Sequence, residues 1–280
     1  MSQIIDGKSL SKKLIDDIKS AVNRIVENNK RLPGLAVMLV GDSVASSIYV
    51  GKKEKMCESI GIRSFVKKYD NDLTEESLIA EITALNEDIN IDGILIQLPL
   101  PTHINQQNII NHVRPDKDVD GFHPVNAGNL FLGYNTFIPC TPFGIIKMLE
   151  HYNISIKSKR VVILGRSNIV GKPLIPLFLQ RDATVTICHS KTINLADIAS
   201  SADVLISAMG RPNYVNKDFV KKGAVVIDVG INRVDNKITG DVCLNEVSNI
   251  ASYITPVPGG VGPMTIAMLM HNTLKAYNLH

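Results

Sequence analysis

The segment at residues 161–173, VVILGRSNIVGKP, constrains the fold of this 280-residue chain more than any other. Four β-forming residues run into Gly165, and Ser167 and Asn168 can cap a helix that follows. Arg166 adds a fixed positive charge at the same place. Because the exposed amide groups at a helix start bind anions, the segment predicts a strand, a tight turn and a helix start that hold a nucleotide phosphate.

The chemistry after the next strand indicates which nucleotide binds. Residues 183–188 form a second strand-like run one helix length later, which is the spacing of a Rossmann unit, although Gly165 and Gly171 depart from the G-x-G-x-x-G pattern. The residue that closes this second strand meets the adenosine ribose, where an acid selects NAD and a cation or hydroxyl suits a 2′-phosphate. Residues 189–192 are His, Ser, Lys and Thr. We therefore expect NADP as the cofactor.

The composition argues against several classes of protein. Lys and Arg number 30 against 27 for Asp and Glu, and Trp is absent, so the basic surface of a nucleic-acid binder is not expected. The apolar runs are far shorter than the roughly 20 residues of a membrane span, and residues 1–30 hold no signal-peptide core. The four cysteines and seven histidines lack metal-ligand spacing. We expect a cytoplasmic protein without a bound metal, disulfide, membrane or nucleic-acid partner.

Strands and helices alternate along both halves of the chain. The expected strands are 35–40, 62–66, 93–98, 161–164, 183–188, 204–208 and 224–229. The expected helices are 8–28, 46–59, 75–85, 141–152 and 263–277, and residues 115–129 read as a loop. Because the strands are apolar throughout, we expect parallel sheets covered on both faces.

The predicted fold class is therefore α/β, with two α/β domains that flank a cleft. One domain would contain residues 1–140 plus 263–280, and a Rossmann-type NADP-binding domain would contain residues 141–262. Both strand sets would present their carboxyl ends, where α/β ligands usually bind, toward that cleft.

Two segments in the first half carry candidate polar groups. Tyr49 and Lys53 are four residues apart on one helix face, and Gln97 ends an otherwise apolar strand. From the residues alone, Lys53 can also be a solvated helix charge, and Gln97 can serve only a loop.

Two further segments leave similar alternatives open. The acids at 116, 118 and 120 form either a solvated turn or a site for an aminopyrimidine-like ring, and they lack the spacing of a calcium loop. The run PVPGGVGPMT at 256–265 is either rigid ligand-contacting backbone or an interdomain turn.

Five motifs resemble the bifunctional methylenetetrahydrofolate dehydrogenase/methenyltetrahydrofolate cyclohydrolase family. They are YxxxK at 49–53, QLPLP at 97–101, PxKDVDG at 115–121, GRSxxVGxP at 165–173 and PGGVGPMT at 258–265. The motifs span nearly the whole chain in the order of the family, so the resemblance displaces the plainer alternatives at these positions.

The resemblance implies an enzyme with two activities and a homodimeric assembly. NADP would take a hydride from 5,10-methylenetetrahydrofolate, and water would convert the methenyl product to 10-formyltetrahydrofolate. A monofunctional dehydrogenase or cyclohydrolase of the same family is the alternative, which the presence of both Lys53 and the Gly165 turn disfavours. A non-catalytic nucleotide sensor would be expected to lack Lys53 or Gln97.

The resemblance also implies a role for each matching residue. The catalytic set is Lys53, Gln97, Tyr49 and Asp120: Gln97 would orient Lys53, Tyr49 would position the pterin, and Asp120 would accept hydrogen bonds from its amino-pyrimidine edge. A cationic intermediate beside Lys53 would favour its neutral amine, which can accept a proton. The other positions implied for folate binding are Leu98, Pro99, Pro258, Gly259 and Gly260.

A separate set is implied for NADP. Arg166 and Ser190 would hold the 2′-phosphate, Gly165 and Ser167 the dinucleotide backbone, and Ile231 the nicotinamide side.

Overall fold

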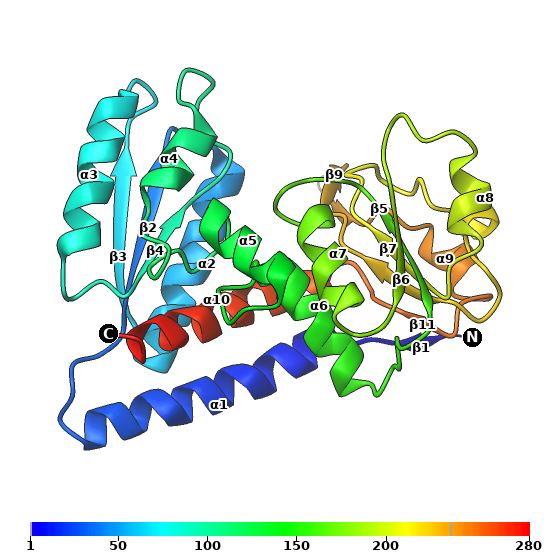
Figure 1. The fold of residues 1–280 in the computed structure, drawn as a ribbon, viewed down its shortest axis with the longest axis horizontal. Coiled ribbons are helices and arrows are strands. Elements are labelled where there is room, and N and C mark those ends of the chain that lie inside the picture. The colour runs from blue at the N-terminus through cyan, green and yellow to red at the C-terminus, as the bar shows by residue number, and fades with distance from the viewer. Residues whose placement is uncertain (1, 236) are drawn as a thin grey trace. The chain divides into compact units, whose positions relative to one another are not determined.

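The chain divides into two units, each built on a parallel sheet, in a computed structural model that describes residues 2–235 and 237–280 (Figure 1). Unit 1 contains the chain up to Lys12, Leu130–Tyr134 and Pro139–Thr265. Unit 2 contains Lys13–Asn129, Asn135–Ile138 and Ile266–His280. Helices α1 (Gly7–Glu27) and α10 (Val261–Tyr277) are each divided between the units. The predicted α/β class is confirmed.

Unit 1 holds a six-stranded parallel sheet in the order β1-β11-β8-β7-β5-β6. The strands are β1 (Gln3–Ile4), β11 (Tyr253–Ile254), β8 (Val225–Asp228), β7 (Val204–Ser207), β5 (Arg160–Leu164) and β6 (Thr184–Cys188). Helices α6 (Cys140–His151) and α7 (Gly171–Leu179) lie on one face, and α8 (Leu195–Ala199) and α9 (Leu244–Val247) lie on the other (Figure 1). Because the chain moves from β5 to β6 and then back across to β7, the strand order reverses beside β5, which is where such sheets bind ligands.

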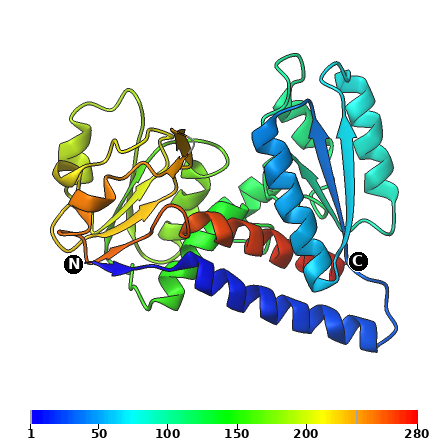
Figure 2. The same ribbon diagram turned by 180° about the vertical axis from the view of Figure 1, so that it is seen from behind.

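Unit 2 holds a three-stranded parallel sheet in the order β3-β2-β4. These strands are β3 (Arg63–Tyr69), β2 (Gly34–Val40) and β4 (Gly93–Ile96). Helices α3 (Glu75–Glu87) and α4 (Gln106–His112) cover one face, and α2 (Val44–Ile60) covers the other, as the two opposite views show (Figures 1 and 2). The core packs Met38 of β2 and Ile94 of β4 against Ile82 of α3. No helix among the described residues is both long and apolar enough to cross a membrane.

Several regions of the chain differ from the expected elements, among them α4, where no helix was expected. Residues 115–129 were expected to be a loop, but α5 (Pro124–Leu132) begins inside them. Pro124 fits the first helical turn, and the His123 Nδ1 atom accepts a hydrogen bond from the Val125 N–H, which caps the helix start. The helix after Gly165 begins only at Gly171, because Ser167 Oγ accepts from Val170 N at 3.2 Å and holds the intervening residues in a turn.

Short elements of unit 1 complete the fold. The hairpin of β9 (Asn232–Val234) and β10 (Lys237–Thr239) is antiparallel, and a 3-10 helix, η1, spans Lys217–Phe219. The pattern of apolar residues predicts none of them, since each has four residues or fewer.

Candidate functional site

A lysine and a glutamine meet at the carboxyl end of β4 in unit 2. Helix α2 begins at an N-cap, Ser43, whose Oγ atom accepts a hydrogen bond from Ser46 N, and this start places Tyr49 and Lys53 one turn apart. Lys53 Nζ donates to Gln97 Oε1 at 3.0 Å, and Gln97 Nε2 donates to the Leu98 carbonyl oxygen at 2.9 Å. The glutamine is thus oriented by its own strand end and presents its oxygen to the lysine.

The residue that follows Gln97 lies close to an acidic residue, Asp120. The Leu98-Pro99 peptide bond is cis, and Leu98 lines a small cavity of about 10 Å³ together with Asp118 and the half-buried Asp120. The structure therefore brings Asp120 to the same strand end as Gln97.

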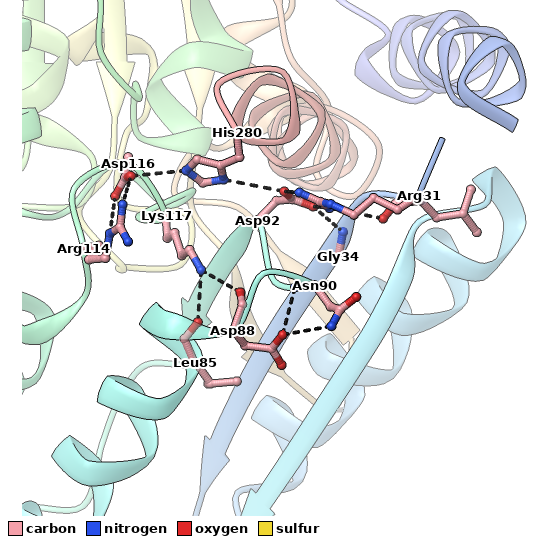
Figure 3. Close-up of polar contacts among 11 residues, drawn as sticks. Arg31, Gly34, Leu85, Asp88, Asn90, Asp92, Arg114, Asp116, Lys117 and His280 are labelled. Carbon is pink, nitrogen blue, oxygen red and sulfur yellow. Dashed lines mark hydrogen bonds and ion pairs between the residues drawn. The ribbon is translucent and has the colours of Figure 1, made fainter. Parts of the chain in front are cut away.

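The three aspartates of the predicted acidic cluster have different environments. Asp118 is buried and accepts hydrogen bonds from His123 N and Asn126 Nδ2, and its burial raises its pKa. Burial also acts to raise the pKa of Asp116, but its hydrogen bonds from Arg114 and His280 outweigh that effect and lower it (Figure 3). Asp118 and Asp116 therefore have structural partners, and Asp120 lines the small cavity beside Leu98.

Figure 3 also shows the contacts that hold the segment at residues 116–120 in place within unit 2. The Lys117 ammonium donates to the carbonyl oxygens of Leu85 and Asp88, and Arg31 pairs with the buried Asp92 carboxylate at 2.6 Å. These bonds hold the chain just before β4 and the segment before Asp120, so that acid sits on a rigid support.

Gly259 and Gly260 of the last motif lie in unit 1, between β11 and α10. Gly259 has a φ of +108°, and its carbonyl oxygen accepts from Lys8 N at 2.9 Å. A Cβ on Gly260 would lie 2.5 Å from the Pro256 carbonyl oxygen, so no larger residue fits there. Pro258 follows a cis peptide bond. The positive φ of Gly259 and the close approach of Gly260 to the Pro256 carbonyl oxygen are therefore sufficient reasons for both glycines.

A cavity of about 330 Å³ lies at the carboxyl ends of β5, β6 and β7 in unit 1. Its polar lining consists of Arg166, His189, Ser190, Thr192, Arg211 and Tyr214. No carboxylate is among the described residues that line it. Two guanidinium groups without a lining acid favour an anionic ligand, and the position is the strand-reversal point where Rossmann folds bind nucleotides.

Two glycines let the backbone close tightly around this cavity. Gly165 has a φ of +121°, and a Cβ there would lie 2.2 Å from the Ala208 carbonyl oxygen. A Cβ on Gly171 would lie 2.0 Å from the Gly165 carbonyl oxygen. The turn between β5 and α7 thus has no space for side chains at either position, which matches a loop that must approach a phosphate closely.

A buried carboxylate holds the turn after β7, and residues of this turn line the cavity. Asp241 accepts hydrogen bonds from the backbone N–H groups of Met209, Gly210 and Arg211, at 2.7, 3.2 and 2.9 Å. Asp228 lies beside it and accepts from Asp241 N at 2.9 Å. Burial raises the pKa of Asp228 to about 6, although three backbone N–H bonds act to lower it.

The structure brings only part of the predicted cofactor set to this cavity. Gly165, Arg166 and Ser190 line it, whereas Ser167 and Ile231 do not. Ile231 follows β8 in the same sheet and is 50% exposed. Sequence reasoning missed Arg211 and Tyr214; the only available signal was their position just after the buried strand β7.

This architecture defines a nucleotide-binding α/β enzyme, and comparisons with known proteins name its family. Residues 5–120 match the catalytic domain of tetrahydrofolate dehydrogenase/cyclohydrolase, and residues 139–280 match its NAD(P)-binding domain. The "Bifunctional protein FolD" of Halalkalibacterium halodurans is 53% identical over 98% of this chain and 98% of its own. The chain belongs to the tetrahydrofolate dehydrogenase/cyclohydrolase family.

Solved structures agree with this assignment. The crystal structure of bifunctional FolD from Campylobacter jejuni, a methylenetetrahydrofolate dehydrogenase/cyclohydrolase, is 47% identical, with a TM-score of 0.98 and full coverage of both chains. The Trypanosoma brucei enzyme, solved in complex with NADP cofactor and an inhibitor, is 37% identical with a TM-score of 0.95 and covers 99% of this chain and 98% of its own.

Proposed function

We propose that this chain oxidises 5,10-methylenetetrahydrofolate with NADP and hydrolyses the resulting 5,10-methenyltetrahydrofolate to 10-formyltetrahydrofolate. The observation that carries the proposal is the 3.0 Å hydrogen bond between Lys53 and Gln97, in a chain whose other unit has an acid-free cavity lined by two arginines. A base is needed for the hydrolysis and a nucleotide site for the oxidation.

The residues of the unit 1 cavity fit NADP by their donors. Arg166 and Ser190 would hold the 2′-phosphate, while the Gly165 turn and Ser167 would face the dinucleotide backbone. Ile231, which follows β8, would flank the nicotinamide. NADP, when bound, supplies the acceptor for the hydride that leaves the one-carbon bridge.

In the hydrolysis, water adds to the methenyl carbon, which is cationic and lies between N5 and N10. A C–O bond forms, and the water loses a proton to the neutral amine of Lys53. The hydroxyl group of the adduct then loses its proton as the C–N5 bond breaks and the C=O bond of the formyl group forms. N5 takes up one proton and the formyl group stays on N10, so one proton is released in total. Gln97 aligns Lys53 by accepting from its Nζ atom.

The remaining residues would bind the folate. Asp120 would accept hydrogen bonds from the amino-pyrimidine edge of the pterin, Tyr49 would stack on or position its ring, and Leu98 and Pro99 would contribute the apolar wall. Pro258, Gly259 and Gly260 would contribute backbone to the same ligand. We assign the catalytic domain to residues 1–140 plus 263–280, and the NADP-binding domain to residues 141–262.

An absorbance assay tests both activities in one preparation. The purified chain is given 5,10-methylenetetrahydrofolate with NADP or NAD, and then methenyltetrahydrofolate alone, with the uncatalysed hydrolysis measured in the same buffer. We expect faster reduction of NADP than of NAD and a hydrolysis rate above the uncatalysed one. Only one of the two activities would favour a monofunctional relative, and neither would contradict the proposal.

We further propose a cytoplasmic homodimer. The edge strand β6 has no neighbour on its outer side within the described chain, and open sheet edges favour pairing with a second copy. Cys57, Cys140 and Cys188 are buried free thiols, which suits a reducing compartment.

A further inference from the structure

Arg211 brings a second fixed positive charge to the cavity of unit 1. It stands on the turn after β7, while Arg166 follows β5 and Ser190 follows β6. Three neighbouring strands therefore deliver these side chains to one place. Among the described residues, neither Arg166 nor Arg211 forms an ion pair with a carboxylate. Both charges are thus available to a ligand.

The Arg211 side chain is held in place although it is exposed. Its backbone N–H donates to the buried Asp241 carboxylate at 2.9 Å, which fixes the turn. Its guanidinium carbon lies 5.1 Å from the centroid of the Tyr214 ring, and that ring packs edge-on against Phe219 at 5.5 Å. A guanidinium that rests on an aromatic ring loses less freedom when it binds an anion.

The composition of the cavity indicates which anion it faces. The lining includes Ser190 and Thr192 from the segment after β6, where a Rossmann fold meets the adenosine ribose. It does not include Ile231, at the nicotinamide side, or the first residue of α7, Gly171. The cavity therefore corresponds to the adenosine half of a dinucleotide, whose anion besides the pyrophosphate is a ribose 2′-phosphate.

We propose that Arg211, held against Tyr214, is a second specificity-determining residue that binds the 2′-phosphate of NADP together with Arg166. This inference rests on the proposed function, in which NADP is the cofactor. A planar guanidinium can give two parallel hydrogen bonds to one phosphate, so two arginines can bind its three free oxygens. Ser190 adds a hydroxyl to the same group.

Titration calorimetry with three ligands tests the assignment without any turnover. NADP and adenosine 2′,5′-bisphosphate carry the 2′-phosphate, whereas ADP has the adenosine and the pyrophosphate without a 2′-phosphate. For Arg211→Ala, we expect NADP and the bisphosphate to bind about 10- to 100-fold more weakly, because the loss of one charge-assisted hydrogen bond weakens binding by about that factor. The affinity for ADP should fall by less than about 2-fold, because ADP has no 2′-phosphate. Equal losses for all three ligands, or no loss for any, would overturn the proposal.

Two further variants sharpen the result. Arg160→Ala is the matched control, because this exposed arginine begins β5 at the opposite end of the sheet, and it should bind all three ligands as the wild type does. Arg211→Lys keeps the charge and guards against a folding defect in the alanine variant. Its affinity for the bisphosphate should lie between those of wild type and Arg211→Ala; wild-type affinity would contradict a role for the stacked guanidinium.

Failure of this inference can be told apart from failure of the proposed function. A wild-type chain that binds neither NADP nor the bisphosphate contradicts NADP as the cofactor. A wild-type chain that binds both, with Arg211→Ala binding them equally well, contradicts only the role of Arg211.

Discussion

Lys53 is the residue on which the hydrolysis depends, and its removal should separate the two activities. Lys53→Met keeps the apolar stem and loses the amine that contacts Gln97. Hydrolysis of methenyltetrahydrofolate should fall at least about 100-fold, a loss typical of general base catalysis. The dehydrogenase should fall less if Lys53 serves there only to orient the folate.

The control for this experiment lies on the same helix. Lys55 is exposed on α2, so Lys55→Met removes an equal charge and should leave both rates unchanged. Folded Lys53→Met protein that hydrolyses methenyltetrahydrofolate at the wild-type rate would show that Lys53 is only a surface charge. Gln97→Ala should impair hydrolysis less than Lys53→Met, because it acts through the position of the lysine.

Asp228 should make the stability of the protein depend on pH. Its pKa is raised by burial to about 6 in the folded chain, against 3.8 for an ordinary aspartate. Between about pH 4 and pH 6 the folded state therefore binds more protons than the unfolded state, so this group's contribution to stability falls as the pH rises and is constant above that window. The total change is up to about 3 kcal/mol.

Urea unfolding of wild type and Asp228→Asn at several pH values measures this contribution. The asparagine does not titrate and gives up one acceptor for backbone N–H groups, so this variant should be less stable overall. The difference between the two free energies of unfolding should nevertheless change in the stated direction from pH 4 to pH 6. A constant difference would mean that Asp228 titrates normally.

The turn between β5 and α7 is sensitive to a single added methyl group. Gly165→Ala would force a Cβ against the Ala208 carbonyl oxygen at a φ of +121°, which we expect to cost at least about 1–3 kcal/mol and to weaken NADP binding. Gly128→Ala in α5 has no atom within 4 Å of the new carbon, so it should stabilise the chain by about 0.5–1 kcal/mol. Thermal unfolding of both variants, with calorimetric binding of NADP, gives the comparison, and equal stability of the two would contradict this account.

The length of a helix or strand decides whether the sequence predicts it. The strands β2 and β5 and the helix α3 contain continuous or periodic apolar residues, and the expected and observed bounds agree to within two residues. The two-residue strand β1 carries no such pattern, because it forms only by pairing with β11. Helix α5 was missed because the surrounding Pro, Asp and Gly residues resemble a loop, and its cap is a histidine side chain.

In the candidate site, too, some residues could be predicted from the sequence and others could not. Lys53 and Gln97 could be paired from the sequence, because the end of a parallel strand and one face of a helix are predictable positions and the family motifs include both. Arg211 could not, since its orientation depends on Asp241 and Tyr214, two residues that no motif connects to it.

For the whole molecule, the open edge of unit 1 predicts a homodimer. Light scattering at micromolar concentration should give about twice the chain mass of 30.6 kDa. Val185→Lys places a charge on the edge strand β6 and should shift the protein toward monomer, whereas Val234→Lys on the exposed hairpin strand β9 should not. A wild-type monomer would contradict the dimer, and a Val185→Lys variant that stays dimeric would place the interface elsewhere.

The pairing of β1 with β11 has a consequence for how the chain folds as it is synthesised. The register joins Gln3 to Tyr253, so the first strand emerges from the ribosome about 250 residues before its partner. The β3-β2-β4 sheet needs only neighbouring segments and can form early. Unit 2, which contains this sheet, is nevertheless incomplete without α10, because Asn272 of α10 donates hydrogen bonds to the carbonyl oxygens of Val119 and Ile138. Both units therefore become complete only after β11 and α10 have been synthesised, and a nascent chain halted earlier would expose two unfinished folds to chaperones and proteases.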